Sequence, residues 1–271
     1  MKITFIGGGN MAAAMITGML ARGMAAADLC AVDVQAAARE RLTKDFGIAT
    51  HAVAELPARQ SDVLILAVKP QQMAEVAKGL RPLIQKQLVL TIAAGIRTAD
   101  LSRWLGGYRN IVRAMPNTPA LVGAGIAGLY ARPEVSEAGR QAAQNLLDAV
   151  GSTVWLDSED HLDAVTALSG SGPAYVFYFL EAMQEAGRAM GLPDAASRAL
   201  SLQTLAGASR LAAESQEPPA TLRARVTSSG GTTERALNEM EAGHVKQHLV
   251  AAICAAQTRS RELGEQFGAS A

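Results

Sequence analysis

The sequence predicts an α/β protein in which a doubly wound parallel sheet is followed by an all-helical domain. In the first half of the chain, short apolar runs alternate with helical stretches, which is typical of parallel strands buried between two layers of helices. From His161 to the end, no segment has a convincing strand pattern. We therefore expect one domain over residues 1–157 and a second, helical domain over residues 158–271.

The composition is that of an ordinary globular protein with a small-molecule partner. Acidic and basic residues number 25 each, so no overall charge attracts nucleic acid or a membrane surface. The two cysteines, Cys30 and Cys254, lie far apart and lack metal-ligand spacing, which favours a reducing compartment. No apolar run reaches the roughly 18 residues that a membrane span needs. A cytoplasmic location is expected.

Seven strands and four helices are predicted in the first domain. The strands are short, apolar and rich in β-branched residues, and right-handed crossovers through the intervening helices bring them into one sheet. The predicted strands are Lys2–Gly7, Asp28–Val34, Asp62–Val68, Gln87–Ala94, Asn110–Met115, Gly125–Ala131 and Ser152–Leu156, and the helices are Met11–Arg22, Gln35–Phe46, Gln71–Leu80 and Ser136–Val150.

The longest helix predicted in the second domain, Pro173–Met190, has almost no polar face. A helix that is apolar nearly all round is a buried helix, and a domain of this size has little material with which to cover it. We expect a second subunit to cover it, with the central helix of a monomeric bundle as the alternative. Its apolar residues are Tyr175, Val176, Phe177, Phe179, Leu180, Met183 and Ala186.

A glycine-rich turn joins the first strand to the first helix. The residues Gly7-Gly8-Gly9-Asn10-Met11-Ala12 match the pattern G-x-G-x-x-A in the context that the pattern requires, after a strand and at the start of a helix. Glycines let the backbone approach a pyrophosphate, and the helix N-terminus supplies N–H groups and partial positive charge. The turn predicts a Rossmann-type domain that binds a nicotinamide dinucleotide.

Asp33 lies at the end of the second predicted strand, where an acid that binds the adenosine ribose is expected. A carboxylate there suits the two hydroxyls of NADH and repels the additional phosphate of NADPH. The alternative is that Asp33 caps the helix that begins near Gln35. Arg39 and Arg41 lie within that helix. Local chemistry therefore leans towards NADH.

Two further loops follow strands at the same edge of the sheet. Ala67-Val68-Lys69-Pro70 ends the third long strand, and Lys69 could contact the cofactor through its charge or its backbone, or be a solvated surface lysine. Met115-Pro116-Asn117-Thr118-Pro119 is stiffened by two prolines. It either holds the Asn117 amide near the nicotinamide or is a structural turn.

Two clusters of glycine and serine mark the helical half, at Ser169–Pro173 and at Ser228–Thr233. The second cluster combines flexible glycines, hydroxyl donors and the start of a helix, which together form a suitable socket for a small carboxylate. A turn with a threonine N-cap is the alternative, although a cap accounts for one hydroxyl and not for the whole run.

Five motifs resemble those of pyrroline-5-carboxylate reductases. They occur in that family's order and span nearly the whole chain. They are Phe5-Ile6-Gly7-Gly8-Gly9-Asn10-Met11-Ala12, Ala67-Val68-Lys69-Pro70-Gln71, Arg113-Ala114-Met115-Pro116-Asn117-Thr118-Pro119, Leu168-Ser169-Gly170-Ser171-Gly172-Pro173-Ala174-Tyr175-Val176 and Val226-Thr227-Ser228-Ser229-Gly230-Gly231-Thr232-Thr233.

The resemblance implies a Rossmann domain followed by a helical dimerisation domain that interleaves with a second subunit. It also implies a homodimer, often assembled further into a ring of dimers, with the substrate near the dimer interface. The implied activity is hydride transfer from NADPH or NADH to the C=N carbon of 1-pyrroline-5-carboxylate, which gives L-proline in the last step of proline biosynthesis.

The same resemblance assigns roles to residues at matching positions. Cofactor contacts are implied at Gly7 to Ala12, at Ala67 to Pro70 and near Ala94. Ser228 and the backbone from Gly230 to Thr233, with Gly231 and Thr232 between them, would hold the substrate carboxylate. The Thr233 hydroxyl, as the implied catalytic group, would hydrogen-bond the ring nitrogen.

Three positions depart from the family pattern. Ser229 stands where a proline is usual, Arg223-Ala224 replaces a Lys-Asp pair, and Ala54 replaces an asparagine on the adenosine side. Family members commonly use NADPH and many accept NADH, which contrasts with the carboxylate at Asp33. The sequence leaves the preference between NADPH and NADH open.

The implied substrate is a cyclic imine, and its protonated form accepts a hydride without a strong acid from the enzyme. This agrees with a hydroxyl-rich site that lacks histidine and cysteine, where Thr233 orients the ring. Holding the two reacting rings in near-attack geometry can contribute roughly 7–11 kcal/mol.

Two other functions agree less well with the sequence. A dehydrogenase of 3-hydroxyacids generally needs a lysine or histidine on the first long helix of the second domain, where Arg188 is the only strongly basic side chain. A non-catalytic dinucleotide-binding scaffold would not need the hydroxyl-rich loop. His244 and His248 are spaced i,i+4, but no carboxylate or cysteine completes a metal set, so no metal is expected.

Overall fold

The computed structural model describes residues 1–269, which form two compact units. The first unit comprises Met1–Ser171 together with the segment from Ala255 onward, and the second is Gly172–Cys254. Within the described residues, no helix is both long and apolar enough to cross a membrane.

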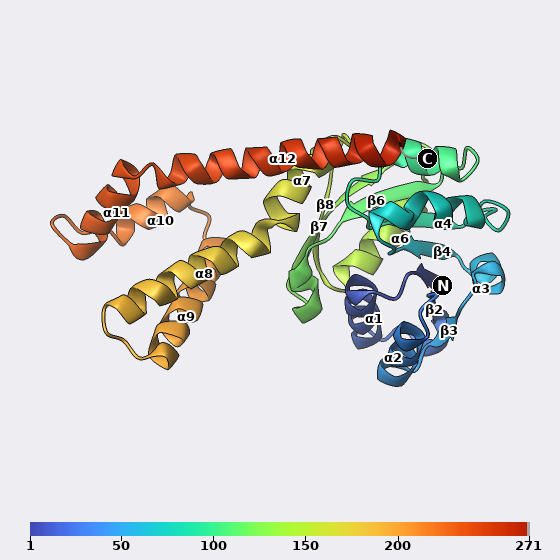
Figure 1. The fold of residues 1–271 in the computed structure, drawn as a ribbon, viewed down its shortest axis with the longest axis horizontal. Helices are drawn as coiled ribbons and strands as arrows, with labels where there is room; N and C mark the ends of the chain where they lie inside the picture. Colours follow the sequence, from blue (N-terminus) through green and yellow to red (C-terminus); the bar gives the residue numbers. More distant parts are fainter. Residues whose placement is uncertain (270–271) are drawn as a thin grey trace. The chain divides into compact units, whose positions relative to one another are not determined.

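The first unit is built on one eight-stranded sheet with the order β3-β2-β1-β4-β5-β6-β7-β8 (Figure 1). The strands from β1 to β6 all run parallel, and β1 pairs with both β2 and β4. The predicted doubly wound sheet is therefore confirmed. The strands are β1 (Ile3–Ile6), β2 (Leu29–Val32), β3 (Ala49–His51), β4 (Val63–Leu66), β5 (Leu88–Thr91), β6 (Ile111–Met115), β7 (Gly125–Ala131) and β8 (Gly151–Trp155).

Helices cover both faces of this sheet, because alternate residues of each strand enter different cores. In β4, Ile65 belongs to one buried cluster, whereas Leu64 and Leu66 belong to the other. The first cluster includes α1 and α6, and the second includes α4 and α5. The helices of this part are α1 (Asn10–Ala21), α2 (Ala36–Phe46), α3 (Glu55–Gln60), α4 (Met73–Leu80), α5 (Thr98–Trp104) and α6 (Glu137–Asp148).

The sheet differs from the expectation in two places. The edge strand β3 was not predicted, because three residues of mixed polarity carry no strand pattern. The strand β7 extends the sheet as predicted but runs antiparallel to β6, a direction that the sequence pattern did not indicate. Only residues 116–124 connect these two strands, and a parallel crossover needs about a dozen residues or more. The strand β8 then pairs parallel with β7 after the crossover through α6.

The segment that follows β8 belongs to the first unit, so the compact units divide the chain at a different place from the predicted boundary at residue 157. The side chain of Arg113 in β6 is only 2% exposed, and its Nη1 lies 3.0 Å from Oε1 of Glu159. The carboxylate of Glu159 also accepts hydrogen bonds from the Thr98 backbone N–H (2.7 Å) and hydroxyl (2.6 Å). These contacts fasten the chain to β6 and α5 before it reaches α7 (His161–Val165).

The last helix, α12 (Val245–Ala269), explains why the end of the chain also belongs to the first unit. The hydroxyl of Ser260 donates to Oδ1 of the buried Asp163 at 2.8 Å, and Oδ2 of the same carboxylate lies 3.1 Å from Arg97. The order of predicted helices and strands alone does not show that the end of α12 packs as part of the first unit.

The second unit is entirely helical, as predicted for this part of the chain. In Figure 1, α8 and α9 lie side by side, and Gly187 permits this contact because a Cβ there would lie 2.6 Å from Oγ of Ser197. The helices of this unit are α8 (Gly172–Ala189), α9 (Asp194–Glu214), α10 (Pro219–Arg225), α11 (Thr232–Ala242) and the beginning of α12.

The apolar face of α8 is exposed in the single chain. Tyr178 is 73% exposed and Phe177 is 59% exposed, whereas Leu180 and Gly187 are buried. The alternative in which α8 is the central helix of a monomeric bundle is therefore wrong. An exposed apolar face of this kind marks a surface that another protein chain covers.

We predict that Glu159→Ala lowers the free energy of unfolding by about 3–5 kcal/mol, because it leaves the Arg113 guanidinium buried without its counter-charge. Chemical denaturation measures the change. As a control, Glu262→Ala removes the half-exposed partner of Arg259 and should cost less than about 1 kcal/mol. Equal losses in the two variants would contradict a structural role for the buried pair.

Candidate active site

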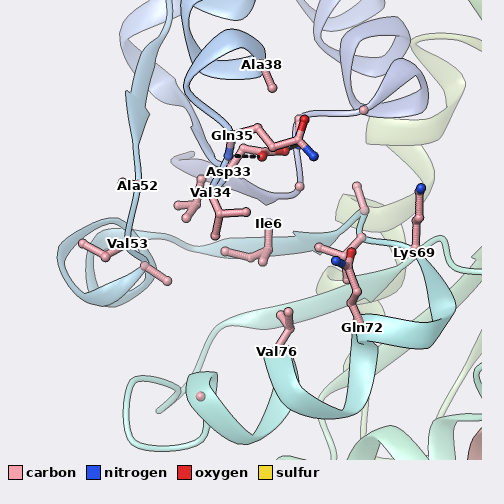
Figure 2. A pocket seen from close by; sticks show the side chains of 18 of the residues that line it. Ile6, Asp33, Val34, Gln35, Ala38, Ala52, Val53, Lys69, Gln72 and Val76 are labelled. Atoms are coloured by element: carbon pink, nitrogen blue, oxygen red, sulfur yellow. Dashed lines mark hydrogen bonds between the residues drawn. The ribbon is translucent and has the colours of Figure 1, made fainter.

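A cavity of about 940 Å³ lies at the carboxyl ends of β1, β2 and β4, where the strand order reverses. Open α/β sheets bind ligands at this topological switch point. Figure 2 shows the cavity with Val53 and Lys69 towards opposite ends of the view. The residues that line it include Gly7, Gly8, Gly9, Asn10, Asp33, Val34, Gln35, Ala37, Ala38, Arg41, Val53, Ala54, Glu55, Ala67, Val68, Lys69, Gln72, Glu75 and Val76.

The glycine turn forms the base of this cavity, and Gly7 is the most constrained residue in it. Its φ is +104°, and a Cβ at this position would lie 2.7 Å from the carbonyl oxygen of Ala67. Its backbone N–H donates to the Val32 carbonyl at 2.8 Å. Glycine is required here for both the backbone conformation and the close approach.

Gly9 has a different role, because a Cβ there would meet no atom within 4 Å. Gly9 is also the N-cap of α1, and no side chain caps this helix end. The first N–H groups of a helix lack intrahelical partners and attract anions. An open space beside an uncapped helix N-terminus fits the pyrophosphate of a dinucleotide, as the sequence predicted.

Asp33 is held by backbone groups on both sides. Its Oδ2 accepts the N–H of Gly8 at 2.8 Å, and its Oδ1 accepts the N–H of Gln35 at 2.8 Å, the bond drawn in Figure 2. The N-cap of α2 is Gln35 and not Asp33. The carboxylate therefore orders the turn before α2 and lines the cavity as well.

Some of the predicted cofactor residues lie in the cavity lining and others do not. Lys69 is exposed and belongs to the lining. Ala12 is fully buried, where it allows close packing of α1 on the sheet. Met11, Pro70 and Ala94 are not among the residues that line the cavity.

The Asn117 side chain is engaged in structure. Its Nδ2 donates to the Ser169 carbonyl at 3.2 Å, and its Oδ1 accepts the N–H of Ile126 at 3.0 Å. Asn117 thereby connects the loop after β6 to β7 and to the π-helical turn Thr166–Gly170. Within the first unit, the Asn117 amide therefore has the structural role that was the alternative to a contact with the nicotinamide.

The predicted substrate loop lies in the second unit, between α10 and α11. The Gly231 N–H donates to the Ser228 carbonyl at 3.1 Å, Gly230 has a φ of +73°, and its N–H donates to Oε2 of Glu234 at 2.7 Å. The N-cap of α11 is Gly231, without a side-chain cap. The alternative of a threonine N-cap is therefore wrong, although the turn exists. Thr232 and Thr233 are the first two helical residues.

Several lining residues were not predicted from the sequence. Gln72 and Val76 follow the loop at Lys69, and Arg41 follows Ala37 in α2. Each pair has i,i+4 spacing, which places its two members on one face of a helix. The i,i+4 spacing, combined with the predicted ends of the strands, would have been enough to predict these residues from the sequence. Within residues 1–269, no group of three His, Cys, Asp or Glu side chains is placed to hold a metal ion.

The glycine turn, the uncapped helix and the carboxylate after β2 define a dinucleotide-binding enzyme of the oxidoreductase class. A family model described as pyrroline-5-carboxylate reductase dimerisation matches residues 159–263, and one described as NADP oxidoreductase, coenzyme F420-dependent, matches residues 2–95. The chain belongs to the pyrroline-5-carboxylate reductase family.

Individual relatives agree over the full length. The pyrroline-5-carboxylate reductases of Pseudomonas aeruginosa and Haemophilus influenzae are 47% and 44% identical to this chain, each over 98% of both chains. The solved structure of a pyrroline-5-carboxylate reductase from Coxiella burnetii has a TM-score of 0.91 at 39% identity, covering 97% of this chain and 98% of that one. The Plasmodium falciparum pyrroline carboxylate reductase, solved with NADP bound, has a TM-score of 0.88 at 28% identity and the same coverage.

The family match also accounts for the exposed face of α8. The dimerisation model matches residues 159–263, a range that includes the whole second unit, so this protein self-associates through this part of the chain. The resemblance and the fold class predicted from the sequence are confirmed, and the choice of an oxidoreductase over a scaffold is confirmed with them.

We predict that Gly9→Ala weakens NADH binding by about 10- to 100-fold, the equivalent of the roughly 1–3 kcal/mol that an added methyl group costs in a close contact. Its stability should stay normal because the new Cβ meets no protein atom. Gly7→Ala should instead lower stability by about 1–3 kcal/mol. Calorimetric titration and thermal unfolding separate the two effects. Normal affinity in Gly9→Ala would show that the pyrophosphate does not lie there.

Proposed function

We propose that this protein reduces 1-pyrroline-5-carboxylate to L-proline with a hydride from NADPH or NADH. The observation that carries the proposal is the identity to pyrroline-5-carboxylate reductases along the whole chain, 47% over 269 residues in one case. The same chain has the cavity that such a reaction requires, at the switch point of its sheet.

The nicotinamide cofactor supplies the hydride, and the protein holds and orients it. In this proposal the turn from Gly7 to Ala12 and the loop from Ala67 to Pro70 hold the cofactor, with Ala94 close to it. Gly9 leaves room for the pyrophosphate beside the start of α1. Lys69, at the end of the view away from Val53 in Figure 2, places a positive charge beside this anionic ligand.

The substrate carboxylate binds at the start of α11 in the same proposal. The N–H groups of Thr232 and Thr233 follow an N-cap that has no side-chain bond, so this end of the helix suits an anion. Ser228 adds a hydroxyl, and Gly230 and Gly231 form the turn that lets the chain pass close to the ligand.

Thr233 orients the imine and does not deliver a strong acid. A threonine hydroxyl is too weak an acid to protonate the ring nitrogen, so the substrate arrives as the protonated iminium ion, whose carbon accepts the hydride. The Thr233 hydroxyl forms a hydrogen bond to the ring nitrogen of the substrate. This bond orients the substrate ring and sets its distance from the nicotinamide ring.

The assembly and location belong to the same proposal. We infer a homodimer that buries the face of α8 and is able to form a ring of dimers, with the substrate near the dimer interface. Residues 1–157 bind the cofactor, and residues 158–271 bind the substrate and form the dimer. We also infer that the enzyme works in the cytoplasm, because the chain has only two cysteines, far apart in the sequence, which favours a reducing compartment.

Turnover tests the proposal directly. The purified protein should consume NADPH or NADH only when pyrroline-5-carboxylate is present and should form proline in equal amount. Folded protein that binds the dinucleotide but leaves the imine unchanged would refute this activity and would favour another dehydrogenase or a scaffold.

We predict that Thr233→Ala lowers kcat/KM for the imine by about 10- to 100-fold, the effect of losing one hydrogen bond to a charged group. Dinucleotide affinity should stay unchanged, because in this proposal the Thr233 hydroxyl binds the imine and not the dinucleotide. Thr233→Ser should restore most of the activity. Thr232→Ala keeps the neighbouring backbone N–H and serves as the matched control. Wild-type kinetics in Thr233→Ala would remove Thr233 from the site.

A further inference from the structure

The backbone of Gly8 binds two side chains of opposite charge. Its N–H donates to Oδ2 of Asp33 at 2.8 Å, and its carbonyl oxygen accepts a hydrogen bond from Nη2 of Arg41 at 2.8 Å. Both side chains line the same cavity. Within the described residues, they form no ion pair with each other, so each charge is available to a ligand.

The position of Gly8 indicates which part of a dinucleotide these charges meet. Gly8 is the middle glycine of the turn that approaches the pyrophosphate, and Asp33 follows the second strand. In this fold, an acid at that place binds the hydroxyls of the adenosine ribose, whereas an arginine nearby accommodates a 2′-phosphate. This chain has both groups, and both form a hydrogen bond to the backbone of the same residue, Gly8.

We propose that Asp33 and Arg41 together determine which nicotinamide cofactor this enzyme uses. The Asp33 carboxylate accepts the 2′ and 3′ hydroxyls of NADH, and Arg41 pairs with the 2′-phosphate of NADPH. The enzyme uses both cofactors and favours NADH. This inference rests on the proposed function only in that the ligand of the cavity is a nicotinamide dinucleotide.

NADH is favoured because the carboxylate is the less mobile of the two groups. Each oxygen of Asp33 accepts a backbone N–H at 2.8 Å, and the residue is half-buried, so it cannot turn away from an approaching phosphate. Each oxygen can still accept a further bond from a ribose hydroxyl. Arg41 is exposed, and one hydrogen bond to Gly8 holds it. Water and salt weaken its attraction for the phosphate.

The other charges of the cavity reinforce this preference. Glu55 and Glu75 are among its lining residues and add negative charge. Lys69 is the second cation of the lining within the described residues, and it lies towards the end of the cavity opposite Val53 in Figure 2. Arg41 is therefore the cation placed on α2, beside Asp33, to offset a phosphate on the ribose.

The test measures binding of NADH and NADPH by calorimetric titration without the imine. The fragments 5′-AMP and 2′,5′-ADP repeat the comparison without the nicotinamide. We expect the wild type to bind NADH about tenfold more tightly than NADPH. Arg41→Ala should weaken NADPH binding by about tenfold and leave NADH binding nearly unchanged. Asp33→Asn should tighten NADPH binding and weaken NADH binding, which reverses the preference.

Three controls separate the effect of charge from an effect on folding. Lys44→Ala removes an exposed cation of the same helix that is not among the lining residues, and it should leave the ratio of affinities unchanged. Asp33→Asn has one acceptor oxygen where the carboxylate has two, so one backbone N–H loses its partner; its melting temperature shows whether the turn survives. Arg41→Lys keeps the charge and should retain part of the NADPH affinity.

An unchanged ratio of affinities in both Arg41→Ala and folded Asp33→Asn would overturn the inference. A wild type that binds NADPH far more tightly than NADH would also overturn it. Turnover of the imine is measured separately with the preferred cofactor. If binding discriminates as expected but the imine is not reduced, the proposed function fails and the assignment of the two residues stands.

Discussion

The close approach of the Gly7 backbone to the end of β4 is the constraint on which the dinucleotide site depends. The carbonyl of Ala67 occupies the space that any side chain at residue 7 would need, so β1 and β4 meet without a gap where the sheet changes direction. The chain can then turn directly into α1, whose uncapped N-terminus opens beside Gly9. The start of α1 and the cavity beside it thus depend on this contact between two backbones.

Charge is arranged around this rigid turn by hydrogen bonds to the backbone. The backbone of Gly8 holds the Asp33 carboxylate and the Arg41 guanidinium by hydrogen bonds, and both residues line the cavity. Deeper in the sheet, the buried pair of Arg113 and Glu159 fastens the segment after β8 to the first unit. The second unit differs, because the apolar face of α8 is exposed to solvent in the single chain. Self-association of two chains covers this face. The dinucleotide cavity is therefore formed by the first unit, whereas the exposed face of α8 in the second unit is a surface for a second chain.

Much of the architecture could be predicted from the sequence because local patterns carried it. Short apolar runs between helical stretches indicated seven strands, and the glycine turn between a strand and a helix indicated the cofactor site. What escaped prediction depends on distant contacts: the short edge strand β3, the reversed direction of β7, and the return of α12 to the first unit. The roles of Asn117 and Arg41 were also hidden, since an amide that bridges two loops and a helical arginine that reaches a glycine carbonyl have no signature in a single segment.

The central claim is that the dinucleotide bound at this turn passes its hydride to the carbon of a cyclic imine. The most direct measurement uses NADH that carries deuterium at the transferred position and locates the label in the product by mass spectrometry and NMR. The account predicts proline with one deuterium on the ring carbon that was part of the C=N bond. Oxidation of the cofactor with unlabelled proline, or with the label on another carbon, would contradict it.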